Sequence, residues 1–207
     1  MEFRYSALML SGICVLIFIF QIIPGFTELF VLDQDKYLQV WRYLSAIFLH
    51  GGIVHLMYNL LALVLFGSIL EKFIGSKRFL LVFFVSGVLA NIISINFYSS
   101  SLGASGAIFG VIGALVIVRP WMTVWAFNLP MPMIVAGILW AIGDLIGAVA
   151  FLSGNALSNT GNIAHLSGML FGIILGFIYK KPFSEEKNRK LVIDEKSIRT
   201  WEDNYLR

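Results

Sequence analysis

Charged residues are scarce in this sequence. Asp, Glu, Lys and Arg make up 13% of the 207 residues, whereas soluble domains contain roughly 25%. Hydrophobic residues make up 58% of the chain. Water therefore cannot be the main solvent of this protein, and a membrane-embedded bundle is the better interpretation than one or two soluble domains.

Cysteine and net charge are also low. Cys14 is the only cysteine, so the chain forms no internal disulfide and its redox compartment cannot be read from cysteine usage. The formal net charge is +3, and the basic residues cluster in short loops and near the C-terminus. This distribution is typical of topology control in a membrane. We expect no nucleic-acid partner, no cofactor and no metal.

Long apolar runs, in contrast, recur along the chain. A membrane-spanning helix needs about 20 mostly apolar residues, and we interpret six apolar runs as spans, of which the fourth is shorter than that length. We therefore predict an all-α membrane protein with six transmembrane helices. The runs are 7–23, 54–70, 79–97, 105–119, 132–152 and 163–179.

The predicted organisation is a membrane domain over 1–180 and a polar cytoplasmic tail over 181–207. We expect the first run to be a retained helix rather than a signal peptide, because no small-x-small cleavage site precedes Pro24. No Arg-rich, acid-poor transit peptide is present, which favours a prokaryotic cell membrane over an organelle.

Lys and Arg are distributed unequally between the two sets of connecting loops. One set holds only Lys36 and Arg42, which three acidic residues offset. Cytoplasmic loops of membrane proteins carry an excess of Lys and Arg, so the other set, together with both termini, should be cytoplasmic. That set contains Arg4, Lys72, Lys77, Arg78, Arg119 and eight basic residues from Lys180 onward.

Three remote segments place reactive groups at the same level of the predicted bundle. His50, His55 and Asn59 begin the second helix, Ser105 begins the fourth and His165 begins the sixth. All three helices should run from the outer to the inner face. Polar residues within membrane spans are functional candidates by default, so a site near the outer face is predicted.

The fourth helix is short for a membrane span. From Ser105 to Val118 it would measure roughly 21 Å, at about 1.5 Å per residue, against a hydrocarbon core about 30 Å thick. Ser105 should therefore lie several ångströms below the outer boundary, and hydrolysis there would require a water-filled hollow.

Small residues mark the helix faces beside Ser105 and His165. Glycines at such spacing allow membrane helices to approach closely, so we expect the fourth and sixth helices to pack tightly. These glycines are Gly106, Gly110 and Gly113 in one helix and Gly168, Gly172 and Gly176 in the other.

Each candidate residue also has a structural interpretation. Ser105 could be only a helix N-cap, and His165 could be only a packing residue. Asn59 could join two helices by a hydrogen bond. His50, His55 and His165 could together bind zinc, although such a site would leave Ser105 and its flanking glycines unexplained.

Taken in order, these residues resemble the motifs of the rhomboid intramembrane serine proteases. The resemblance extends from Trp41 to Gly172, and any one of its motifs would be weak evidence by itself. The matching motifs are Trp41-Arg42, the HxxxxHxxxN pattern of His50, His55 and Asn59, Glu71 with Gly75-Ser76, Gly103-Ala104-Ser105-Gly106, and Ala164-His165 with Gly168 and Gly172.

This resemblance implies a catalytic dyad in which Ser105 is the nucleophile and His165 the general base. It also implies an oxyanion site made by His55, Asn59 and the Ser105 backbone N–H. The substrates would be transmembrane proteins cut near the outer face. Phe109 stands where relatives often have tyrosine, and we expect it to pack against His165.

Several alternatives remain open. Asp144 lies in the fifth predicted helix, where a carboxylate is costly; we expect it to face the bundle or water near a substrate gate, outside the dyad. Residues 153–162 could form a mobile cap over the site. The rival function classes are a protease-dead rhomboid relative that binds membrane proteins and a small transporter or channel.

Overall fold

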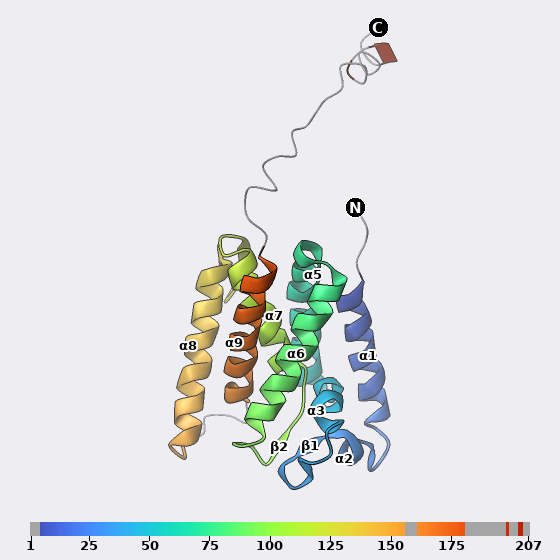
Figure 1. Cartoon of the computed structure of the whole chain (residues 1–207). Coiled ribbons are helices and arrows are strands. Elements are labelled where there is room, and N and C mark those ends of the chain that lie inside the picture. Colours follow the sequence, from blue (N-terminus) through green and yellow to red (C-terminus); the bar gives the residue numbers. More distant parts are fainter. Residues whose placement is uncertain (1–4, 156–160, 181–197, 199–202, 205–207) are drawn as a thin grey trace.

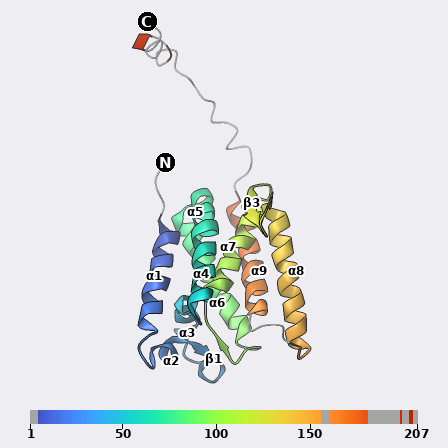
Figure 2. The same ribbon diagram turned by 180° about the vertical axis from the view of Figure 1, so that it is seen from behind.

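The structure is a computed structural model that describes residues 5–155, 161–180, 198, 203 and 204. Its main body is a bundle of helices that lie roughly side by side, as Figures 1 and 2 show from opposite directions. The long helical stretches of the bundle are α1 (Ser6–Phe20), α4 (Ile53–Ala62) continuing through the π-helical η3 (Leu63–Gly67) into α5 (Ser68–Ile74), α6 (Ser76–Ser94), α7 (Ser105–Val118), α8 (Met133–Leu152) and α9 (Asn162–Tyr179).

Four of these described stretches are long and apolar enough to cross a membrane. They are Ile53–Ile74, Ser76–Ser94, Met133–Leu152 and Asn162–Tyr179. Helices α1 and α7 are shorter apolar helices. Each of the six predicted runs thus corresponds to an apolar helix, and the crossing of the membrane by α1 and α7 stays a prediction.

The second predicted run, 54–70, ends four residues before the helical stretch does, because the stretch continues through Glu71 to Ile74. Glu71 is fully buried inside the helical stretch that continues to Ile74. Its carboxylate accepts hydrogen bonds from the backbone N–H groups of Ser6 (3.0 Å) and Ala7 (3.1 Å) and from Ser76 Oγ (2.7 Å). These bonds tie the start of α1 to the turn between α5 and α6 and satisfy the buried charge.

The bounds of two other helices differ from the prediction. Helix α1 ends at Phe20 rather than at residue 23. The next side chain, Gln21, instead donates from Nε2 to the His50 carbonyl (3.1 Å) and accepts from the His50 N–H (2.9 Å). Helix α6 begins and ends about three residues earlier than the predicted run over 79–97.

Helix α7 lies at the centre of the bundle. It is buried along most of its length between α6, α8, α9 and η3. A Cβ on Gly168 would collide with the Gly106 carbonyl, and one on Gly172 with the Gly110 carbonyl. The backbones of α7 and α9 therefore touch, which confirms the close approach predicted from the glycines.

Short elements fold together at the end of the bundle where α4, α7 and α9 begin (Figure 1). Strand β1 pairs antiparallel with β2, with Leu32 opposite Ser101, and this pairing joins the loop before α4 to the loop before Ser105. The elements are α2 (Phe26–Phe30), β1 (Leu32–Asp33), η1 (Gln34–Lys36), α3 (Arg42–Ser45), η2 (Ala46–Phe48) and β2 (Ser100–Ser101).

Arg42 supports this region from within, while its neighbour Trp41 remains exposed. The Arg42 side chain is buried; its Nη1 donates to the carbonyls of Glu28 and Val31, and its Nε donates to Gln39 Oε1 (2.6 Å). The arginine of the Trp-Arg pair in the predicted outer loop thus joins separate parts of this loop by hydrogen bonds.

At the opposite end, β3 (Thr123–Ala126) and β4 (Leu129–Pro132) form a hairpin between α7 and α8, visible in Figure 2. The first residues of α1 and the last residues of α9 lie at this same end (Figure 1). This arrangement agrees with termini on one side of a membrane, and the identity of that side stays a prediction.

Candidate active site

A cavity of about 1210 Å³ opens among the helices that carry the predicted reactive residues. Side chains from α4, α7 and α9 line it, in agreement with the prediction that three remote segments meet at one level. Its lining includes Ser105, His165, His55, Asn59 and Phe109.

Ser105 is the first residue of α7 and is half-buried at the cavity wall. The N-cap of α7 is Ala104, and no side chain caps this helix end. The interpretation of Ser105 as only an N-cap is therefore wrong. Because the first N–H groups of a helix have no intrahelical acceptor, the Ser105 N–H has no acceptor within α7.

Gly103 allows the imidazole of His55 to lie against the loop that leads into Ser105. Its φ of +119° favours glycine, and a Cβ there would lie 2.7 Å from His55 Cε1 and 3.0 Å from His55 Nε2. The Gly51 N–H donates to His55 Nδ1 (3.3 Å), which leaves the proton of the neutral ring on Nε2. A hydrogen-bond donor is thereby held next to the start of α7.

Asn59 lies one helical turn beyond His55 and is buried. Its Nδ2 donates to the His55 carbonyl within the same helix (2.8 Å). The predicted alternative, a bond between helices, is not the one formed among the described residues. An amide carries two N–H groups, so the second one can serve a ligand in the cavity.

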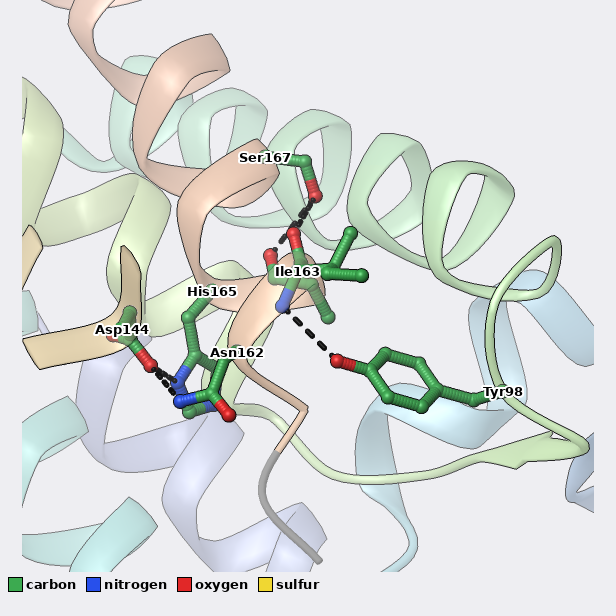
Figure 3. A network of polar contacts seen from close by, with 7 residues as sticks. Tyr98, Asp144, Asn162, Ile163, His165 and Ser167 are labelled. Atoms are coloured by element: carbon green, nitrogen blue, oxygen red, sulfur yellow. Dashed lines mark hydrogen bonds and ion pairs between the residues drawn. The ribbon is translucent and has the colours of Figure 1, made fainter. Parts of the chain in front are cut away.

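The imidazole of His165 is held on one face and at one nitrogen. Phe109 stacks on the ring, with centroids 4.3 Å apart and planes 7° apart, which confirms the predicted packing contact. The His165 Nδ1 lies 2.9 Å from Asp144 Oδ1 (Figure 3). The Nε2 is therefore the nitrogen left for Ser105.

The contact between Asp144 and His165 was not predicted. Asp144 faces the bundle, which is one of the two orientations that the sequence predicts; it is buried there and also accepts a hydrogen bond from Asn162 Nδ2 (2.7 Å). A signal was present in the sequence, because a lone carboxylate inside an apolar helix requires a polar partner.

Ser105 Oγ and His165 make no hydrogen bond to each other in the described part of the chain. Catalytic hydrogen bonds are often long before a substrate binds and tighten in the complex. The observed arrangement is thus a hydroxyl and an imidazole that line the same cavity, with the imidazole hydrogen-bonded to Asp144 through its Nδ1.

Tyr98 anchors the first turn of the helix that carries His165. Its hydroxyl accepts a hydrogen bond from the Ile163 N–H (3.2 Å), as Figure 3 shows, and its ring packs on Phe151 at 4.7 Å between centroids. Burial raises the pKa of Tyr98, so the phenol stays neutral. Sequence reasoning did not single out this residue.

His50 supports His55 from outside the cavity lining. It is buried, its Nδ1 donates to the Phe48 carbonyl (3.2 Å), and its ring meets that of His55 edge-on at 5.3 Å. Burial, with a smaller contribution from the charge of His55, lowers the pKa of His50 to about 4. The ring is therefore neutral at physiological pH.

The zinc alternative finds no counterpart among the described residues. They include all three histidines, yet no group of three His, Cys, Asp or Glu side chains there is arranged to hold a metal ion. The predicted cap over 153–162 is only partly visible, because residues 156–160 lie outside the described residues; the cap stays a prediction.

Comparisons with known proteins identify a family for this chain. A family model described as the Rhomboid domain matches residues 37–182. The chain is 30% identical over 183 residues to the rhomboid protease GlpG of Haemophilus influenzae, covering 84% of this chain and 90% of that protein. It is 39% identical over 136 residues to the rhomboid protease GluP of Bacillus subtilis, covering 64% and 24%.

Plant relatives are longer than this chain. The chain is 35% identical over 144 residues to RHOMBOID-like protein 1 of Arabidopsis thaliana, covering 68% of this chain and 35% of that protein. The chain thus spans about a third of that relative's length.

Proposed function

Because the chain belongs to the rhomboid family and is a multi-pass membrane protein, we propose that it is an intramembrane serine endopeptidase. Its substrates are transmembrane proteins, and its dyad is Ser105 and His165. One observation carries this proposal: the cavity contains a hydroxyl at a helix start and an imidazole whose Nδ1 is already engaged, so that Nε2 is available as a base.

The proposed reaction has two steps. His165 Nε2 removes the proton of Ser105 Oγ as the oxygen attacks the substrate carbonyl, and the protonated imidazole then gives that proton to the leaving amine. An acyl-enzyme on Ser105 remains. Water, activated by the same imidazole, releases the new carboxyl terminus and restores the hydroxyl.

Three donors would bind the oxyanion that forms during the attack. They are the backbone N–H of Ser105, Nε2–H of His55 and the second Nδ2 proton of Asn59. Donors placed in advance around a developing negative charge lower the barrier, and loss of one typically costs about 10²–10³ in rate. The positions of His55 beside Gly103 and of Asn59 one turn further support this assignment.

The substrate would be a membrane-spanning helix that unwinds near the outer face. Peptide groups inside a regular helix are already hydrogen-bonded, so cleavage requires a locally extended segment. Both termini of the enzyme would be cytoplasmic, and a prokaryotic cell membrane would be its location. The chemistry above requires no cofactor or metal.

The test is cleavage of a fluorogenic single-span peptide by the purified protein in proteoliposomes. We expect cleavage by the wild type and its loss in Ser105→Ala and His165→Ala. Ser11→Ala is the matched control, because among the described residues the buried Ser11 hydroxyl bonds only to the Ala7 carbonyl of its own helix (2.9 Å).

A serine-directed fluorophosphonate separates the remaining possibilities. The wild type should become labelled and Ser105→Ala should not. A folded wild type that neither cuts the peptide nor reacts with the probe would contradict the proposal and favour the alternative, a catalytically inactive rhomboid-like protein that binds membrane proteins.

A further inference from the structure

We propose that Asp144 is a positioning residue for His165, so that the dyad works with a third, buried member. Its carboxylate holds the imidazole in the tautomer that carries its proton on Nδ1 and thereby directs the Nε2 lone pair toward Ser105. This inference rests on the proposed function and goes beyond the two-residue mechanism that the family resemblance implies.

The contact between the two side chains has a defined direction. Asp144 Oδ1 and His165 Nδ1 are 2.9 Å apart, and a carboxylate only accepts hydrogen bonds. A neutral imidazole has one proton, so donation from Nδ1 leaves Nε2 unprotonated. That nitrogen must be unprotonated in order to accept the proton of the serine hydroxyl.

Asp144 is itself held in place by the helix that carries His165. Its Oδ1 also accepts from Asn162 Nδ2 at 2.7 Å. Asn162 in turn lies against α8 at Gly147, where a Cβ would be 2.6 Å from Asn162 Nδ2. Both hydrogen-bond donors to the carboxylate come from the first turn of α9, as Figure 3 shows.

Two aromatic residues further restrict movement, one of the His165 ring and one of the helical turn that carries it. Phe109 stacks on the face of the ring at 4.3 Å, and Tyr98 binds the Ile163 N–H two residues before His165. With the plane set by Phe109 and the rotation within that plane set by Asp144, the position of Nε2 relative to α7 is defined.

Charge gives a second reason for a carboxylate at this position. The imidazole becomes positively charged when it takes the serine proton, and a buried carboxylate at hydrogen-bond distance stabilises that cation. A residue needed only to pack α8 against α9 could be apolar, whereas a carboxylate in a membrane-spanning helix is costly. Of the two hydrogen bonds that Asp144 accepts from described residues, one comes from the imidazole of His165.

The test compares Asp144→Ala and Asp144→Asn with the wild type in the proteoliposome assay. In both variants kcat should fall by about 10²–10⁴; the upper end is the loss seen when an acid-to-amide change gives the wrong tautomer in a serine protease. KM should change less than about threefold, because the carboxylate does not touch the substrate. The asparagine variant preserves the side-chain shape and guards against simple misfolding.

A spectroscopic readout separates positioning from mere support of the fold. In protein labelled with 15N-histidine, the His165 ring of the wild type should show the proton on Nδ1. In Asp144→Asn the amide N–H₂ can donate to Nδ1, so the proton should move to Nε2 at an unchanged melting temperature. Ser167→Ala is the control, since within the described part of the chain Ser167 Oγ bonds only to the Ile163 and Ala164 carbonyls of its own helix.

The outcomes are distinct. An active wild type with Asp144 variants that keep kcat within about threefold, or that keep the tautomer, overturns this inference alone. A lower kcat explained by a lower melting temperature, with the tautomer retained, also overturns it. A wild type that neither cuts nor reacts with the fluorophosphonate overturns the proposed function, and this inference falls with it.

Discussion

At the scale of single residues, the proposed oxyanion donors differ in how they are held. His55 is fixed through its Nδ1 and rests on Gly103, whereas Asn59 is fixed by a bond to its own helix. Neither contact uses the donor that would face the substrate. The site is thus pre-organised, and its donors should act on the transition state rather than on substrate affinity.

The first prediction concerns these donors. His55→Ala and Asn59→Ala should each lower kcat by about 10²–10³, because the oxyanion exists only after the attack. KM should change little. Initial rates at several peptide concentrations in proteoliposomes would measure both constants. A raised KM with an unaltered kcat would instead place the residue in substrate binding.

The second prediction concerns Gly103. Gly103→Ala should lower kcat up to about 10²-fold, because the new Cβ would displace the His55 ring and because its φ of +119° is unfavourable for alanine. The control is Gly12→Ala, where a Cβ meets nothing within 4 Å. Equal kcat for Gly103→Ala and the wild type would show that the His55 ring has no fixed role.

At the scale of elements, the contact between α7 and α9 is the one that aligns Ser105 with His165. The glycines bring the two backbones into direct contact. Since protein interiors are closely packed, a side chain inserted there has no space. The relative height of the two reactive residues therefore depends on small residues that take no part in chemistry.

The third prediction tests that contact. Gly172→Val should destabilise the protein by about 1–3 kcal/mol or more, the usual cost of overpacking, because its Cβ would meet the Gly110 carbonyl. Thermal unfolding in detergent would measure the loss. Gly143→Ala is the control in another helix, since a Cβ there meets nothing within 4 Å. Equal melting temperatures for both variants would contradict the proposed packing.

The fourth prediction concerns the buried carboxylate between α1, α5 and α6. Glu71→Ala removes the acceptor of the Ser6 and Ala7 N–H groups and of the Ser76 hydroxyl. Unsatisfied buried polar groups cost about 1–3 kcal/mol each, so the melting temperature should fall. At low temperature kcat should stay within about twofold of the wild type. A large loss of kcat in the folded variant would argue for a role in the site.

At the scale of the whole molecule, basic residues gather at one end of the bundle. Lys77 and Arg78 at the start of α6 lie at the end where α9 terminates, whereas the cavity residues lie toward the other end (Figure 1). An excess of Lys and Arg marks cytoplasmic loops. The cavity should therefore open toward the outer face.

The fifth prediction tests this orientation by labelling. Cys14 is buried, so Cys14→Ala gives a background without cysteine. On intact cells, a membrane-impermeant maleimide should label Asn155→Cys at the end of α8, and it should label Lys77→Cys only after permeabilisation. Both positions are exposed in the structure. The reverse pattern would invert the proposed topology.

Much of the fold followed from the sequence alone. The six apolar runs, the common level of His55, Ser105 and His165, and the glycine contact of α7 and α9 all depend on length, composition and spacing along single helices. These features are local or repeat with the helical period. They could be predicted without knowing how any helix is rotated against its neighbour.

The tertiary structure decided what depends on rotation and depth between helices. It alone showed that Asp144 faces His165, that Glu71 lies inside a helix rather than at its end, and that Ala104 and not Ser105 is the N-cap. Spacing along one helix does not determine which side chains of two packed helices meet. Which side chains meet is determined by the packing of the whole bundle, because only there do the faces of α7, α8 and α9 come together.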